Sequence, residues 1–195
     1  MTSRVPAQAY PIGPGGRADY DGTMSDPKLT PRRATDSEVT LTQLMEITDA
    51  NVAGNVHGGV IMRLVDTCGA LAAIRHAGGL AVTVAIDEMT FLQPVHIGEL
   101  LVLKSSVNDV GRTSMEVGVR VEANNPVTGR TTHANSAYLV FVAVDDEGRS
   151  RPVPPLVVET DAQRRRQREA RLRRQARLAH KEAVKAQRAT RPPVE

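Results

Sequence analysis

The chain has 195 residues and a formal net charge of +3, which allows one domain of ordinary size with extended ends. The charge is uneven, because residues 159–195 carry twelve Lys or Arg against five Asp or Glu, whereas residues 1–158 are net acidic. Cys68 is the single cysteine, so an internal disulfide is excluded. Since the sequence lacks a signal-peptide pattern and any run near the roughly 18 apolar residues of a membrane span, we expect a soluble cytoplasmic protein.

Composition divides the chain into three parts. Residues 1–37 are rich in Pro and Gly without periodicity, which predicts a disordered leader. Residues 38–158 carry the apolar patterns of a globular domain, and residues 159–195 predict a basic helical tail. We interpret this tail as a solvated helix or one that decorates an oligomer. Contact with nucleic acid or a membrane surface is less favoured, because no aromatic residue interleaves the basic run.

The domain begins with an alternating pattern from residue 39 to 46, which predicts a strand. The turn formers of "DANVAGNVHGG" follow. Residues 58–77 then read as one helix that is apolar nearly all round and stops at the glycines 78–79. A helix with so little polar surface has to be wrapped by other structure.

Four strand-like runs come after the helix, at residues 81–93, 99–110, 113–124 and 130–145. The short connections between them favour antiparallel neighbours in a meander. The predicted fold class is therefore α+β, with a curved antiparallel sheet closed around a long central helix.

Asp66 is the unexpected residue of this helix. A carboxylate among apolar residues is costly unless it is paired, exposed or needed for chemistry. Arg63 lies three positions earlier on the same helix and predicts an ion pair. The small residues Gly69, Ala70 and Ala73 leave room instead for a ligand or a second helix, so spacing alone leaves both readings open.

The "HGG" at residues 57–59 opens the helix. Free N–H groups and the positive end of the helix dipole at this point suit a developing oxyanion. The plainer alternative is a turn followed by tight packing, with His57 as a structural histidine. The sequence contains no GxGxxG, GK[ST], CxxC or HExxH motif, so we expect neither a metal nor a dinucleotide cofactor.

Several segments, in order, resemble one family. "ANVAGNVHGGVIMRLVD" is similar to the active-site segment of hotdog-fold acyl-CoA thioesterases, in particular the cytosolic or brain-type long-chain acyl-CoA hydrolases and their bacterial single-domain relatives. "VTVAIDEMTFLQPVHIGELL", "VGRTSMEVGVRVEA" and "AYLVFVAVDDEGRSRPVPPL" carry the resemblance on, over about residues 38–180. It implies a hotdog fold in side-by-side dimers, commonly arranged as hexamers, with acyl-CoA as substrate.

The resemblance also implies the site residues. Its catalytic pair falls on Asn51 and Asp66, with one residue supplied by each subunit, and the Gly58 N–H would polarise the thioester carbonyl. Residues implied to contact the substrate or its CoA part are His57, Gly59, Gly111, Arg112, Thr113, Ser114, Arg149 and Arg151. No separate cofactor is expected, because CoA belongs to the substrate and the product.

Alternative chemistries remain open at this level. Asp66 could act as a general base on water or attack the thioester directly to give an anhydride. A hotdog enoyl-CoA hydratase or dehydratase would instead use His57 with an acidic partner. A non-catalytic acyl-CoA-binding regulator is the third reading. Medium or long acyl chains are compatible with the aliphatic core.

Overall fold

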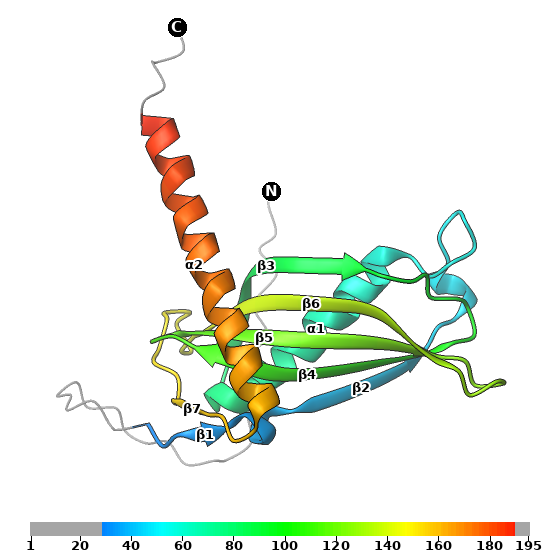
Figure 1. Cartoon of the computed structure of the whole chain (residues 1–195), viewed down its shortest axis with the longest axis horizontal. Helices are drawn as coiled ribbons and strands as arrows, with labels where there is room; N and C mark the ends of the chain where they lie inside the picture. The colour runs from blue at the N-terminus through cyan, green and yellow to red at the C-terminus, as the bar shows by residue number, and fades with distance from the viewer. Residues whose placement is uncertain (1–28, 190–195) are drawn as a thin grey trace, which may run out of the picture.

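An antiparallel sheet separates the two long helices of the protein, so that one helix lies on each face (Figure 1). The computed structural model describes residues 29–189. In chain order the elements are β1 (Arg32–Arg33), η1 (Ala34–Ser37), β2 (Val39–Leu44), η2 (Ile47–Asp49), α1 (Gly58–Ala77), β3 (Ala81–Phe91), β4 (Leu100–Val110), β5 (Ser114–Asn124), β6 (Thr131–Ala143), β7 (Leu156–Val157) and α2 (Asp161–Ala189).

Helix α1 is the centre of the core, and its predicted bounds are confirmed. It ends at Gly78, whose φ of 68° is a left-handed conformation that glycine adopts without strain. Gly69 lies against the sheet so closely that a Cβ there would come within 3.1 Å of the Phe141 ring. The helix packs on strands β2 to β6, which confirms the predicted arrangement of a sheet around a central helix.

The main sheet has the strand order β2-β4-β5-β6-β3. Strands β4, β5 and β6 form the predicted meander, but β3 pairs with β6 at the far edge and not with β4. The chain therefore crosses from one side of the sheet to the other between residues 92 and 99. This crossing leaves β2 and β3 as the two edge strands.

Helix α2 lies on the outer face of the sheet, the face opposite α1 (Figure 1). It begins with a capping box, in which Thr160 Oγ1 accepts from Gln163 N and Gln163 Oε1 accepts from Thr160 N. Gln163 and Ala170 are buried against the sheet, whereas most other side chains in the first half of the helix are exposed, so the helix is solvated on all but one side. Its second half extends beyond the sheet.

The predicted leader of residues 1–37 falls mainly outside the described residues. Its last part, however, forms β1 and η1, and β1 pairs in parallel with β7. Regular structure therefore begins earlier than the predicted strand at residue 39. Between residues 29 and 189, no helix is long and apolar enough to cross a membrane.

Candidate active site

The turn before α1 is organised around the side chain of Asn51. Its Oδ1 accepts hydrogen bonds from Ala53 N at 2.8 Å and Asn55 N at 3.2 Å, and its backbone N–H donates to Asn55 O at 2.7 Å. The amide Nδ2 has no recorded partner among residues 29–189. Asn51 can therefore offer a donor to a ligand oxygen, while its own oxygen is occupied by the turn.

His57 caps the helix N-terminus. Its Nδ1 accepts from Gly59 N at 2.9 Å, so the Gly59 N–H that was expected to assist at the substrate is engaged within the chain. The N–H groups of Val60 and Ile61 both donate to the His57 carbonyl. Within the described part of the chain, the Gly58 N–H has no recorded acceptor, which leaves it as the free donor at the positive end of the helix.

These free donors face an open cavity of about 360 Å³. Asn51 and Gly58 form part of its polar wall, and the residues from 91 to 95 form the opposite wall. The full lining is Asn51, Asn55, Val56, Gly58, Ile61, Phe91, Leu92, Gln93, Pro94 and Val95. A thioester carbonyl in this cavity could meet a backbone donor and an amide donor together.

Asp66 lies elsewhere, two turns further along α1 or about 12 Å along its axis. It is half-buried, and its Oδ1 accepts from the hydroxyl of Thr83 on β3 at 2.6 Å. Among the ion pairs of residues 29–189 there is none between Asp66 and Arg63, so that explanation of the carboxylate finds no support. Sequence reasoning missed Thr83, which lies seventeen positions away on another element.

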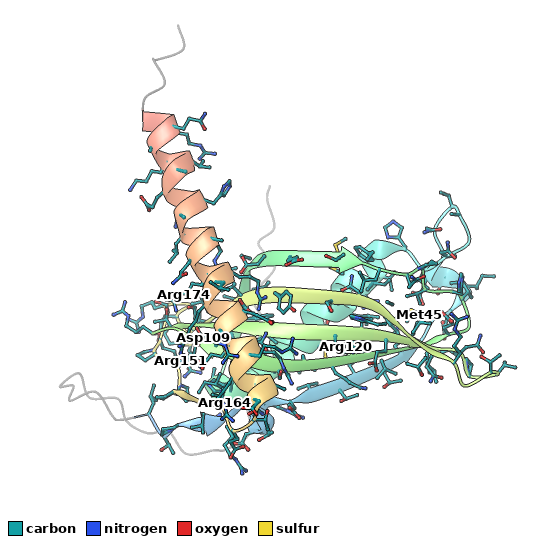
Figure 2. The ribbon with its side chains drawn as sticks, viewed as in Figure 1. Met45, Asp109, Arg120, Arg151, Arg164 and Arg174 are labelled. Carbon is teal, nitrogen blue, oxygen red and sulfur yellow. The ribbon has the colours of Figure 1, made fainter. Side chains whose placement is uncertain are left out.

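Arg151, one of the residues expected at the CoA moiety, lies at the opposite end of the sheet from Met45 (Figure 2). Arg151 is occupied there, because its guanidinium donates to Ala77 O and Val144 O and so closes the C-terminus of α1. Arg149 pairs with Asp145 and Glu147 in a hairpin loop.

The β4–β5 turn is formed by residues 111–114. The Gly111 N–H donates to Ser114 O, and the Thr113 carbonyl accepts from Ala143 N. Arg112 is exposed, and its guanidinium has no recorded partner in the described range. Of the three arginines expected to bind phosphate, Arg112 is therefore the one that the fold leaves available.

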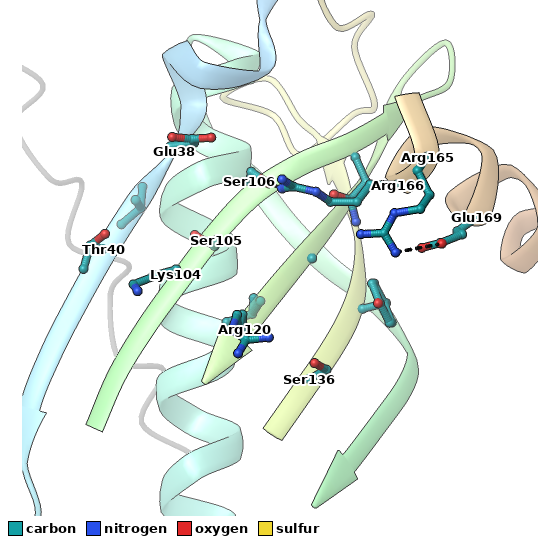
Figure 3. A pocket seen from close by; sticks show the side chains of 15 residues that line it. Glu38, Thr40, Lys104, Ser105, Ser106, Arg120, Ser136, Arg165, Arg166 and Glu169 are labelled. Carbon is teal, nitrogen blue, oxygen red and sulfur yellow. Dashed lines mark hydrogen bonds and ion pairs between the residues drawn. The ribbon is translucent and has the colours of Figure 1, made fainter. Parts of the chain in front are cut away.

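A larger groove of about 490 Å³ lies on the outer face, between α2 and strands β2, β4, β5 and β6 (Figure 3). Three of its four cations have acidic partners, since Lys104 and Arg120 pair with Glu122 and Arg165 pairs with Glu169, and the fourth, Arg166, donates to Ser106. None of the catalytic candidates lines it. The smaller cavity is therefore the one lined by the catalytic candidates Asn51 and Gly58.

Two features bear on a nucleophile and a metal: the burial of Cys68 and the spatial grouping of His, Cys, Asp and Glu side chains. Cys68 is buried with its Sγ 3.3 Å from Ser105 Oγ, and burial raises the pKa of its thiol. It is therefore a core residue and not an activated nucleophile. Between residues 29 and 189, no group of three or more His, Cys, Asp or Glu is arranged to hold a metal ion.

His57 is also poorly placed for the hydratase reading. That chemistry needs an acidic partner for the histidine, whereas His57 Nδ1 is occupied by Gly59 N–H and no ion pair of the described residues includes it. The geometry thus favours a site built on amide donors and a separate carboxylate.

Comparison with known proteins identifies the class. Residues 53–130 match the family described as the Thioesterase superfamily. The acyl-CoA thioester hydrolase YciA of Salmonella typhimurium is 36% identical over 121 residues, which cover 60% of this chain and 90% of the relative.

Two solved structures are similar over most of their length. A hexameric acyl-CoA thioesterase has a TM-score of 0.73 and 34% identity, covering 84% of this chain and all of the other. An acyl-CoA hydrolase from Staphylococcus aureus, solved with butyryl coenzyme A, has a TM-score of 0.74 and 29% identity, covering 80% and 95%. It has also been solved with single alanine substitutions of an aspartate, an asparagine and a threonine. The chain belongs to the hotdog-fold acyl-CoA thioesterases.

Proposed function

We propose that the protein hydrolyses acyl-CoA thioesters to a free acid and CoA at a site that two subunits build together. The observation that carries this proposal is the separation, within one chain, of the Asn51–Gly58 cavity from the Asp66–Thr83 pair. Neither half is a complete site. A second copy supplies the missing half if it pairs along the strand that lies between them.

Strand β3 supports such pairing. It is an edge strand of eleven residues whose side chains Val82, Val84 and Ile86 are 48%, 55% and 48% exposed. A long apolar edge strand is a template for another strand. Antiparallel pairing of β3 with its copy would bring the start of one strand, with Thr83, beside the end of the other, with Phe91 and the cavity. Asp66 of the partner subunit would then approach Asn51.

The substituted forms of the S. aureus hydrolase support the choice of residues. The asparagine and aspartate changed there are fifteen positions apart, which is the spacing from Asn51 to Asp66. The threonine follows that aspartate by seventeen positions, which is the spacing from Asp66 to Thr83. We therefore add Thr83 to the proposed site as the residue that orients the carboxylate.

In the proposed mechanism, the Gly58 N–H and the Asn51 amide donate to the thioester oxygen as negative charge develops on it. Asp66 removes a proton from a water molecule, whose oxygen attacks the carbonyl carbon. The carbon–sulfur bond breaks, and the CoA thiolate takes up a proton. In the competing route Asp66 attacks first, and water then cleaves the anhydride. After one turnover in water labelled with heavy oxygen, label in the Asp66 carboxylate would identify this second route.

The test is thiol release from a series of acyl-CoAs. Asp66→Asn keeps the size of the side chain and removes its charge, and we expect a loss of about 100-fold or more in kcat. Asp146→Asn, an exposed change in the β6–β7 loop, is the matched control. A wild-type oligomer that releases no thiol from any acyl-CoA would contradict the proposal.

The shared site has its own test. Asn51→Ala and Asp66→Ala subunits are each expected to be inactive, whereas mixed dimers should contain one intact site. Random mixing should restore about a quarter of the wild-type activity. Failure of the mixture to regain activity, with mixed dimers present, would show that each subunit holds a complete site.

The finer assignments follow from the same proposal. Arg112 is the residue that we expect to bind a CoA phosphate. A hexamer of three such dimers is expected from the hexameric relative. Hydrolysis by this route needs no cofactor, and a cytoplasmic location remains a prediction.

A further inference from the structure

Asn135 is the most unusual polar residue of the core. It lies in β6 with 0% of its surface exposed, and neither its Oδ1 nor its Nδ2 has a hydrogen-bond partner among the described residues. Buried amides are nearly always paired, because an unpaired one costs free energy in the folded state. A residue that carries this cost at both of its polar atoms calls for a functional explanation.

Register shows which way the side chain points. From Asn135 to Phe141 the pairing of β6 with β5 is continuous, so Asn135 shares a face with Ala137, Leu139 and Phe141. Those three residues belong to the core beneath α1. Asn135 therefore points inwards, towards the helix that carries the proposed site.

The wall of the catalytic cavity is attached to this part of β6. Phe91 is the register partner of Asn135, and the N–H groups of Leu92 and Gln93 both donate to Ala134 O. Phe91, Leu92 and Gln93 line the cavity. A Cβ added to Gly58 would lie 3.5 Å from the Phe91 ring. Asn135 is therefore paired with a residue that lines the cavity proposed to hold the thioester.

A β-bulge marks the same point. The β5–β6 register shifts between Val121 and Glu122, which leaves Ala134 as the extra residue of β6. Bulges redirect neighbouring side chains and are frequent beside active sites. This irregularity is independent of the missing hydrogen bonds and lies at the same two residues.

A bound water explains the amide poorly. A buried water needs two to four polar partners, whereas the neighbours of Asn135 within the sheet on its own face, Val121, Phe91 and Ala137, have no polar side chain. A hydroxyl group on a substrate suits the site better, since its oxygen can accept from Nδ2 or its hydrogen can be donated to Oδ1. Phe91, the register partner of Asn135, is 49% exposed at the end of its strand and lines the cavity, so it is the residue between the amide and the cavity.

We propose, resting on the thioesterase function above, that Asn135 is the polar end of the acyl-binding pocket and selects hydroxyacyl groups over plain saturated groups of equal length. The hydroxyl binds at the Asn135 amide while the thioester carbonyl lies at Gly58. Asn135 is a specificity-determining residue and takes no part in the chemical step.

The test compares Asn135→Leu with wild type in two measurements. In kcat/KM for hydroxyacyl-CoAs against saturated acyl-CoAs of the same length, wild type should prefer the hydroxyacyl group, and Asn135→Leu should lose about tenfold of that preference. In thermal unfolding without substrate, Asn135→Leu should be at least as stable as wild type, because it removes an unpaired buried amide.

Asn108→Leu is the matched control, since Asn108 is a buried asparagine on β4 whose amide does have a partner, Glu116. This variant should lose stability and keep the substrate preference. An unchanged preference in Asn135→Leu, no preference in wild type, or a loss of stability like that of Asn108→Leu would each overturn the inference. Absence of thiol release from every substrate by wild type would instead contradict the thioesterase function itself.

Discussion

The hydroxyl of Thr83 holds the carboxylate of Asp66 in place across a gap between a helix and a strand. The 2.6 Å bond from Thr83 Oγ1 to Asp66 Oδ1 directs that oxygen towards β3 and fixes the orientation of the other one. A short hydrogen bond to an ionised oxygen is stronger than a neutral one. The orientation of the proposed base therefore depends on a single hydroxyl.

Thr83→Val removes this hydroxyl and keeps the branched shape. We expect kcat for acyl-CoA hydrolysis to fall about tenfold with little change in KM, because the carboxylate loses its orientation and the substrate contacts stay. Thr83→Ser should recover most of the rate. Thr67→Val is the control, since that hydroxyl donates to Arg63 O within its own helix. An unchanged kcat in Thr83→Val would contradict a positioning role.

His76 predicts a dependence of stability on pH. It is buried at the end of α1, its Nε2 lies 2.9 Å from Pro154 O, and its Nδ1 has no partner among the described residues. Burial lowers the pKa of this imidazole, so the unfolded chain takes up the proton first as pH falls. The contribution of His76 is therefore complete above the ordinary pKa of about 6.5 and is lost as pH drops below it.

Denaturant unfolding at several pH values between neutral and mildly acidic checks this expectation. His76→Gln keeps a donor for Pro154 O and does not titrate, so its stability should fall less on acidification than that of wild type. His180→Gln, on the exposed part of α2, should behave as wild type. Parallel pH curves for His76→Gln and wild type would show that another group is responsible.

At the scale of elements, the arginines of α2 hold this helix on the outer face of the sheet through ion pairs and a hydrogen bond to the strands. Arg166 reaches Ser106 and Arg171 pairs with Asp109 on β4, while Arg173 pairs with Glu116 on β5. Arg173 also lies 3.6 Å above the Tyr138 ring of β6, and Arg177 pairs with Asp87 on β3. One helix thus contacts four strands, including the edge strand proposed to form the dimer.

Arg173→Ala should destabilise the fold markedly. Its partner Glu116 is 6% exposed and would be left as a buried charge without its cation, which costs about 3 kcal/mol. Arg165→Ala removes an exposed pair with Glu169 on the same helix and should cost no more than about 0.5 kcal/mol. Chemical denaturation of both variants measures the difference. Equal losses of stability in the two variants would show that the buried Arg173–Glu116 pair contributes no more than the exposed Arg165–Glu169 pair.

The elements were predictable where local patterns decide them. The bounds of α1 follow from its glycines and its continuous apolar run, and Asp66 stood out as a carboxylate inside that run. Thr83 could not be found in this way, because its contact with Asp66 exists only once β3 packs beside α1. The docking of α2 depends similarly on acids spread over three strands. Arg151 was expected at CoA, since sequence does not show that it closes a helix end.

At the scale of the whole molecule, pairing of β3 with its copy in a second subunit is what would complete the proposed site. Ile86→Lys adds a charge at an apolar edge, and two such charges would repel each other across a symmetric pairing. We expect smaller particles by light scattering and a loss of thiol release of about 100-fold or more. Val127→Lys, in the exposed β5–β6 turn, is the control and should change neither quantity. A fully active monomer would contradict the shared site.

The position of α2 in chain order has a consequence for synthesis. The strands leave the ribosome before this helix, because the chain is made from its N-terminus and folding during translation follows the same order. Until the arginines of α2 emerge, the nascent sheet carries Glu116 and Asp109 without their cations. The domain therefore reaches its final stability only after α2, its last described element, is made.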